Sequence, residues 1–143
     1  MKRILMLIML CSAVIQAQMK KEMTVYKTLS CSCCEQWINH MKKNGFKVTT
    51  ITKDTIQEVK RKHGISQKNS SCHTALVDGY VIEGHVNYSA VEKLLQQKPK
   101  NIIGLTVPGM PVGSPGMEFG NQKDPYNILA IKKDGSTIIY EKH

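Results

Sequence analysis

The sequence predicts a single α/β domain, because segments with the period of a β-strand alternate with segments with the period of a helix. A tight-turn signature between two short strand-like runs also indicates a β-hairpin inside the domain. The chain has 143 residues, which suffice for one hydrophobic core but not for two. No internal repeat or low-complexity tract divides it.

The first two predicted elements are a strand over residues 23–29 and a helix over residues 34–44. The segment 23–29 (M-T-V-Y-K-T-L) alternates in character and is rich in residues that favour strands. Gly45 provides a C-terminal stop for the helix. The apolar residues on one face of this helix are Trp37, Ile38 and Met41.

A second strand and helix follow. Residues 46–51 alternate again and predict a strand. The capping box T-I-Q-E at residues 55–58 predicts the start of a helix that ends at His63-Gly64.

The next elements are a hairpin and a third helix. Residues 74–77 and 80–83 are strand-like runs separated by Asp78-Gly79, the residues that a primed tight turn requires. A second capping box, S-A-V-E at residues 89–92, predicts a helix that stops before Pro99. The resulting order, βαβαββα, is that of a thioredoxin-like fold, in which helices cover a sheet of about four strands.

The C-terminal part contains a long loop and a second hairpin. Residues 107–117 are rich in glycine and proline and predict no regular structure. Residues 126–132 and 137–140 are strand-like and flank a turn at Asp134-Gly135. We therefore expect one thioredoxin-like domain over residues 18–143, with this hairpin as an appendage.

Residues 1–17 have the features of a secretory signal peptide. Basic residues follow Met1, residues 4–14 are almost entirely apolar, and small residues end near Ala17. The apolar stretch is too short to span a bilayer, which needs about twenty residues. We therefore expect a cleaved leader that removes Cys11, and a periplasmic mature protein without a stable membrane span. A retained membrane anchor is the alternative.

The formal net charge falls from +9 to +7 when this leader is removed, because Lys2 and Arg3 leave with it and no acidic residue does. The remaining basic residues are scattered in small groups over helices and a turn. No stacking aromatic residues interleave with them, as a nucleic-acid surface would require. The composition therefore argues against a nucleic-acid partner.

Four cysteines of the mature chain are the main functional signal. Cys31, Cys33 and Cys34 lie between the first strand and the first helix, where unpaired backbone N–H groups favour an anion. The pKa values of their thiols should be lowered there, and both metal binding and disulfide exchange need the thiolate. Cys72 lies just before the third strand, in a loop that packs against this site in thioredoxin-like folds. A fourth sulfur is therefore expected to face the first three.

Three kinds of site are compatible with these cysteines. Four sulfur ligands with no neighbouring carboxylate favour Cu(I), with Zn(II) as the second choice, and the crowded C-x-C-C suits a multinuclear copper cluster better than one tetrahedral zinc ion. The spacing of Cys31 and Cys34 is also that of a thiol–disulfide oxidoreductase. Two structural disulfides are the third alternative in an oxidising compartment, although the adjacent Cys33 and Cys34 crowd any two bridges.

Two histidines and two methionines are further candidate metal ligands. His73 adjoins Cys72, and His85 ends the hairpin; the alternative for each is a surface or hydrogen-bonded structural histidine. Met110 and Met117 lie in the loop rich in glycine and proline instead of on an apolar stripe. This position suggests thioether ligation, which also suits Cu(I). The alternative is that both methionines anchor the loop to the core.

Five ordered motifs together resemble the CopG-type family of periplasmic proteins, which occur with copper-resistance genes and were long described as a domain of unknown function. The resemblance spans residues 23–140, and its one visible departure is T-L-S before Cys31, where family members commonly have a Ser-Pro pair. The motifs are C-x-C-C at residues 31–34, S-C-H-T-A at 71–75, G-Y-V-I-E-G-H-V at 79–86, V-P-G-M-P-V-G-S-P-G-M-E at 107–118 and D-P-Y at 124–126.

The resemblance implies a thioredoxin-like fold and copper binding by the conserved cysteines. It also implies a role in interconverting Cu(I) and Cu(II), which is compatible with a copper-binding protein and with a copper oxidoreductase. The expected partners are copper ions and, among proteins, periplasmic copper carriers or efflux components. The implied ligands are Cys31, Cys33, Cys34 and Cys72, and the other candidates in matching motifs are His73, His85, Met110 and Met117.

Overall fold

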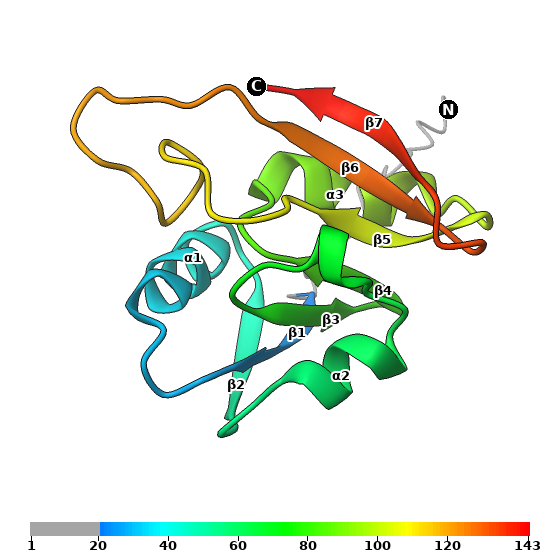
Figure 1. Cartoon of the computed structure of the whole chain (residues 1–143), viewed down its shortest axis with the longest axis horizontal. Coiled ribbons are helices and arrows are strands. Elements are labelled where there is room, and N and C mark those ends of the chain that lie inside the picture. Colours follow the sequence, from blue (N-terminus) through cyan, green and yellow to red (C-terminus); the bar gives the residue numbers. More distant parts are fainter. Residues whose placement is uncertain (1–20) are drawn as a thin grey trace, which may run out of the picture.

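The structure, a computed structural model, describes residues 21–143, which form one mixed seven-stranded sheet with three α-helices. The strands lie in the order β2-β1-β3-β4-β5-β6-β7 (Figure 1). The predicted signal peptide, residues 1–17 with Cys11, lies outside the described residues. Within residues 21–143, no helix is both long enough and apolar enough to cross a membrane.

The elements follow the predicted order βαβαββα as far as α3, and three further strands complete the sheet. An α/β domain is therefore confirmed. The strands are β1 Glu22–Lys27, β2 Lys47–Thr52, β3 Thr74–Val77, β4 Tyr80–Glu83, β5 Ile102–Thr106, β6 Asn127–Lys132 and β7 Thr137–Lys142. The helices are α1 Ser32–Lys43, α2 Gln57–Lys62 and α3 Tyr88–Gln97, with a short 3-10 helix at Gln67–Asn69.

Strand β5 is the element that the sequence patterns do not predict, and it changes the place of the C-terminal hairpin. It pairs in parallel with β4 and antiparallel with β6, so that β6 and β7 continue the main sheet. The expectation of a hairpin appendage is therefore wrong. Gly104 weakens the strand pattern of β5 in the sequence. The close approach of β5 to β4 nevertheless requires a glycine at this position. A Cβ added there would lie 2.6 Å from Val81 Cγ1 and would collide with the Val81 carbonyl oxygen.

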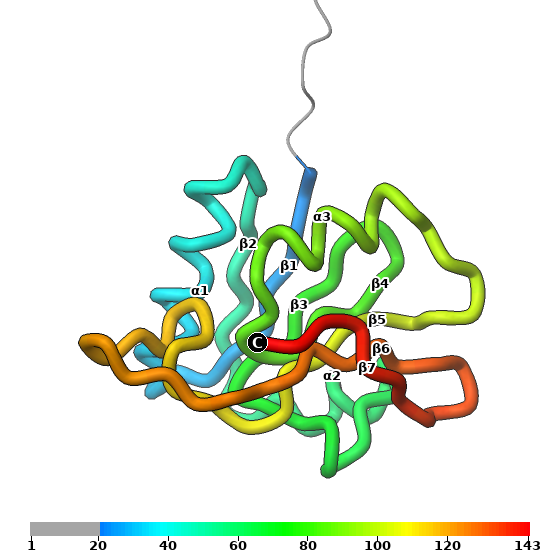
Figure 2. The backbone as a smooth tube through the Cα atoms, turned by 90° about the horizontal axis from the view of Figure 1, so that it is seen from above, coloured from blue at the N-terminus to red at the C-terminus, as the bar shows by residue number. Residues whose placement is uncertain are grey.

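The main core lies on the face of the sheet that α1 and α3 cover, whereas α2 lies at the opposite face (Figure 2). Trp37 of α1 is fully buried in this core, as expected, and its indole N–H donates to the Val86 carbonyl oxygen at 2.8 Å. A smaller cluster of Ile65, Val81 and Ile131 fills the opposite face. The packing of α1 against this core also fixes the position of the cysteine motif, because the helix begins at that motif.

Both predicted capping boxes are displaced from the observed helix starts. Helix α2 begins one residue later than expected, because its N-cap is Ile56 instead of Thr55, and the Thr55 hydroxyl accepts from the backbone N–H of Gln57 at 3.3 Å. Helix α3 begins earlier, because Asn87 is its N-cap and accepts from the backbone N–H of Ala90 at 2.7 Å. Asparagine is among the strongest N-cap residues, so it takes precedence over the serine two positions later.

The contact between Gly104 and Val81 predicts that Gly104→Ala is strongly destabilising. The added methyl group meets backbone atoms of β4 that cannot move without breaking the β4–β5 pairing, so unfolding should become easier by about 3 kcal/mol. Chemical denaturation measures this loss. Gly135→Ala is the matched control, because nothing lies within 4 Å of its added Cβ and only its positive φ of 80° opposes the change, at about 1 kcal/mol. Equal losses in the two variants would contradict the steric explanation.

Candidate metal centre

The C-x-C-C motif forms the N-terminal end of α1, as the sequence predicts. Cys31 is the N-cap residue, and Cys33 and Cys34 lie in the first turn of the helix. The Lys27 ammonium group, at the end of β1, lies 3.0 Å from the Glu35 carboxylate in the same turn. Because the Lys27 side chain is only 7% exposed, this ion pair fixes the strand end against the start of the helix.

Cys31 and Cys34 are joined by a disulfide, with their Cα atoms 5.3 Å apart. Cys33 and Cys72 are free thiols, both half-buried. The alternative of two structural disulfides therefore does not describe this structure. The arrangement is instead that of an oxidised C-x-x-C pair beside two unpaired sulfurs.

The four cysteine sulfurs form one cluster. Their Sγ atoms lie within 4.8 Å of one another, so these residues could hold a metal ion. Cys33 is central, with its Sγ atom 3.6 Å from Cys31 Sγ and 3.9 Å from Cys72 Sγ. The expectation that the Cys72 sulfur faces the other three is confirmed.

His73 and His85 extend the cluster on the side of Cys72. The Cys72 Sγ atom lies 3.3 Å from His73 Nδ1 and 3.0 Å from His85 Nε2. These three residues form a second group that could hold a metal ion. Both histidines are fully buried, which rules out the alternative of surface histidines.

The hydrogen bonds of the two histidines differ. His85 donates from Nδ1–H to the Pro115 carbonyl oxygen at 2.8 Å, so its Nε2 lone pair faces Cys72. Histidines that ligate metals are typically held in this way, with the other ring nitrogen bound to a carbonyl group. His73 packs against Trp37, with ring centroids 4.3 Å apart and ring planes tilted by 41°. Its Nε2 atom is buried without a hydrogen-bond partner, which is rare in proteins.

Burial determines the protonation of this side of the cluster. Burial, together with the neighbouring Cys33, raises the pKa of the Cys72 thiol to about 12. Burial lowers the pKa of His73 well below its ordinary value and also lowers the pKa of His85. In the metal-free protein Cys72 is therefore a neutral thiol between two neutral imidazoles. A metal ion that binds here must displace the thiol proton, so its affinity will depend on pH.

The loop of residues 107–117 covers one side of the cluster but brings in only one of its methionine sulfurs. Met110 Sδ lies 4.0 Å from Cys33 Sγ, and the Met110 side chain is 52% exposed. Met117 participates through its backbone, which donates to the Ser114 carbonyl oxygen and accepts from the Gly113 N–H, each at 2.8 Å. Among the described contacts, none brings the Met117 sulfur to the cluster.

The same loop contributes two groups that the sequence patterns do not reveal. The Pro115 carbonyl oxygen orients His85, as described above. Gly116 presses against the first turn of α1, where an added Cβ would lie 2.7 Å from the Trp37 nitrogen and 3.0 Å from the Cys33 carbonyl oxygen. A proline and a glycine in a loop give no functional signal of their own, so only the folded arrangement identifies them.

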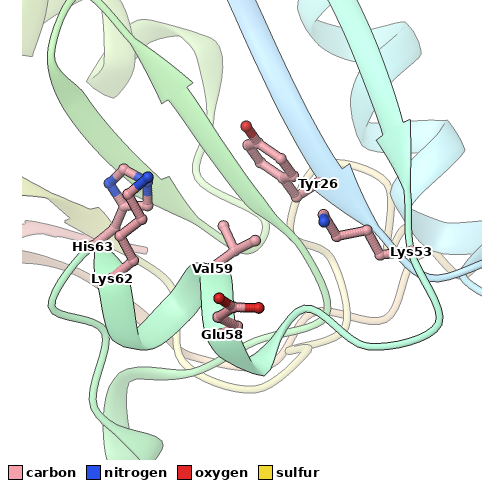
Figure 3. Close-up of a pocket in the computed structure, with 6 residues that line it drawn as sticks. All are labelled: Tyr26, Lys53, Glu58, Val59, Lys62 and His63. Atoms are coloured by element: carbon pink, nitrogen blue, oxygen red, sulfur yellow. The ribbon is translucent and has the colours of Figure 1, made fainter.

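A separate surface hollow of about 190 Å³ lies beside α2, and its lining includes none of the cysteines or clustered histidines (Figure 3). It brings basic side chains together with one carboxylate and has no group of soft metal ligands. The hollow therefore does not belong to the candidate metal centre. Its lining residues are Tyr26, Lys53, Glu58, Val59, Lys62 and His63.

Comparisons with known proteins identify one matching family and two similar solved structures. A family described as a protein of unknown function, DUF411, matches residues 69–117, which include Cys72, both clustered histidines and the covering loop. Two solved structures of copper resistance protein CopG, form 1 and form 2, each match with a TM-score of 0.82 and 36% sequence identity. Each match covers 87% of this chain and 98% of the other chain. Among curated protein sequences, none matches this chain significantly.

The neutral state of His73 and His85 predicts a loss of stability in acid. Below about pH 6.5 the unfolded chain takes up protons on these histidines, whereas the folded protein, with their pKa values lowered, does not. Their contribution to the free energy of unfolding is therefore complete above pH 6.5. It should fall as the pH drops from 6.5 to 5, by at most about 2 kcal/mol per histidine, the value for a group that stays neutral in the folded protein.

Urea denaturation of the unaltered protein and of His85→Gln at pH 7 and pH 5 measures this contribution. Glu83 acts in the opposite sense, because burial raises its pKa, so the comparison between the two proteins is the test. The acid-induced loss should be smaller in His85→Gln by the share of one histidine. The same loss in both proteins would contradict the prediction.

Proposed function

The chain belongs to the family of copper resistance protein CopG, and from this premise we propose that it binds copper in copper resistance or homeostasis. The proposed state of the metal is Cu(I), held by the four clustered cysteines. The observation that carries the proposal is the meeting of four sulfur atoms within 4.8 Å, three from the start of α1 and one from the loop before β3. Cysteine and methionine sulfurs select Cu(I) more strongly than other common ions, and Zn(II) is the second candidate.

Features of the donor set other than its four cysteine sulfurs also suit copper. Among the described residues, the two candidate groups contain only cysteines and histidines and no carboxylate. Met110 adds a thioether at the rim, and imidazoles such as that of His85 also suit copper. Of the two imidazoles, His85 has the carbonyl contact that is typical of a metal ligand, whereas the Nε2 atom of His73 has no partner. For Met117 the proposal rests only on its place in a matching motif.

The disulfide gives the proposed site two states. While Cys31 and Cys34 are bonded to each other, neither can act as a thiolate ligand. Reduction of the bond restores both thiolates and completes the four-cysteine set. Conversely, oxidation of this dithiol releases two electrons and two protons, and the electrons would reduce two Cu(II) ions to Cu(I). This balance supports a proposed role in interconverting the two oxidation states.

The proposed location is the periplasm, with copper carriers or efflux components as protein partners. The location rests on the signal-peptide features of residues 1–17. Two exposed apolar side chains would be available to a partner: Leu29, two residues before Cys31, is 83% exposed, and Met110, which reaches Cys33, is 52% exposed. The strand neighbours β2-β1-β3-β4 and the order of the helices between them support a thioredoxin-like class for the first part of the domain.

The second candidate function is that of a thiol–disulfide oxidoreductase. The observation that favours it is the disulfide between Cys31 and Cys34 at a helix N-terminus, a position that stabilises thiolates and promotes exchange. Cys33 and Cys72 would have no necessary role in this chemistry, whereas the copper proposal uses both.

Copper loading of Cys31→Ser/Cys34→Ser tests the proposed ligands. The variant should bind about half or less of the Cu(I) bound by the reduced unaltered protein, because two of four thiolates are missing. Elemental analysis after anaerobic reconstitution measures the ratio, and X-ray absorption reports the copper–sulfur distances. Ser32→Ala is the matched control, because Ser32 lies exposed within the same motif. Unchanged copper content in the double variant would refute the assignment.

Reduction of insulin distinguishes the two functions. The proposed copper-binding function predicts that the reduced, metal-free protein accelerates insulin reduction no more than Cys31→Ser/Cys34→Ser does. Robust activity in the metal-free protein, abolished when either cysteine is changed, would instead establish the oxidoreductase.

A further inference from the structure

A buried ion pair lies beneath the candidate metal centre. The Glu83 carboxylate on β4 is fully buried, and its Oε1 atom pairs with the ammonium group of Lys60 on α2, which is 3% exposed. Removing two such charges from water is costly, and well-packed apolar side chains are often as stabilising or more so. The neighbouring hydrogen bonds indicate that this ion pair has a role other than stabilising the fold.

The Glu83 carboxylate accepts hydrogen bonds from both sides of the centre. Its Oε1 atom accepts from the backbone N–H of Ser71 at 2.7 Å, and its Oε2 atom accepts from the Thr74 hydroxyl at 2.7 Å. Ser71 directly precedes Cys72, and Thr74 directly follows His73. Glu83 therefore holds both ends of the segment that carries this cysteine and this histidine.

Glu83 also connects that segment to His85. It lies two residues before His85 on the same chain segment, and the intervening Gly84 donates from its N–H to the His73 carbonyl oxygen at 3.0 Å. Ser71 lies directly against Gly84, because a Cβ added to this glycine would collide with the Ser71 side chain. The distances from the Cys72 sulfur to both imidazoles thus depend on one anchored carboxylate.

We propose that Glu83, paired with Lys60, is a positioning residue that fixes Cys72 between His73 and His85. It contacts none of the three ligand side chains and acts through the Ser71 N–H and the Thr74 hydroxyl. The proposal rests on the proposed function for the copper-binding role of these three residues. The positioning of Cys72, His73 and His85 by Glu83 does not require copper and applies to the metal-free protein as well.

Two substitutions separate positioning from stability. Glu83→Met is close to glutamate in size but has no oxygen that could accept from the Ser71 N–H or the Thr74 hydroxyl. It also leaves the Lys60 charge buried without a partner, which is strongly destabilising. Lys60→Met combined with Glu83→Met removes that charge, so much of the stability should return. Both acceptor oxygens remain missing in this double variant.

The experiment measures the alkylation rates of Cys72 and Cys33 by mass spectrometry in the reduced, metal-free, full-length protein. The ratio of the Cys72 rate to the Cys33 rate should rise at least about fivefold in Lys60→Met/Glu83→Met, the size expected for one lost hydrogen bond. Leu94→Ala, a fully buried change in α3, is the matched control for destabilisation and should leave the ratio unchanged. A ratio within twofold of the unaltered protein in the double variant would overturn the proposal.

Two further measurements complete the test. Competition with a Cu(I) chelator should show affinity weakened about tenfold in the double variant, as for other groups that orient metal ligands. If the unaltered protein binds no copper, the proposed function fails, while the alkylation ratio still decides the positioning role. Hydrogen exchange in the unaltered protein needs no variant: the Ser71 amide must be protected as strongly as the amides of β3. Rapid exchange at Ser71 would overturn the proposal.

Discussion

The candidate metal centre depends on the antiparallel pairing of β1 with β3. This pairing sets Tyr26, near the end of β1, opposite Thr74 at the start of β3. The chain therefore leaves β1 toward the C-x-C-C motif at the same edge where it enters β3 from the Cys72 loop. Thr74 in turn pairs with Glu83, and Glu83 pairs with Thr106 at the end of β5. Four segments far apart in sequence thus meet at one edge of the sheet.

Much of this arrangement can be predicted from the sequence, because its signals are local. Alternating strands, helical apolar faces and the Asp78-Gly79 turn identify the elements as far as α3. The sulfur cluster is recognisable because cysteines are rare and closely spaced. Other features depend on tertiary contacts that no short pattern encodes. Gly104, which lets β5 approach β4, also weakens the sequence pattern of β5, so that strand is not predicted. The roles of Pro115 and Glu83 depend on contacts between segments that are far apart in the sequence.

The disulfide decides which donors the centre offers. In the oxidised state the remaining donors are two thiols, two imidazoles and one thioether, and reduction adds two thiols. Reduction therefore raises the share of sulfur among these donors from three of five to five of seven. A single covalent bond at the start of α1 thereby couples the redox state of the chain to the kind of ion that it favours.

Two glycines next to the cluster leave no room for a side chain. A Cβ at Gly84 would collide with Ser71 and lie 2.8 Å from the Val107 carbonyl oxygen, and a Cβ at Gly116 would press on Trp37 and Cys33. Any larger side chain at either position displaces a segment that carries a cysteine of the cluster. In evolutionary terms, neither glycine can be replaced by another residue while selection maintains the centre. A lineage that abandons the centre should therefore lose its glycines together with its cysteines.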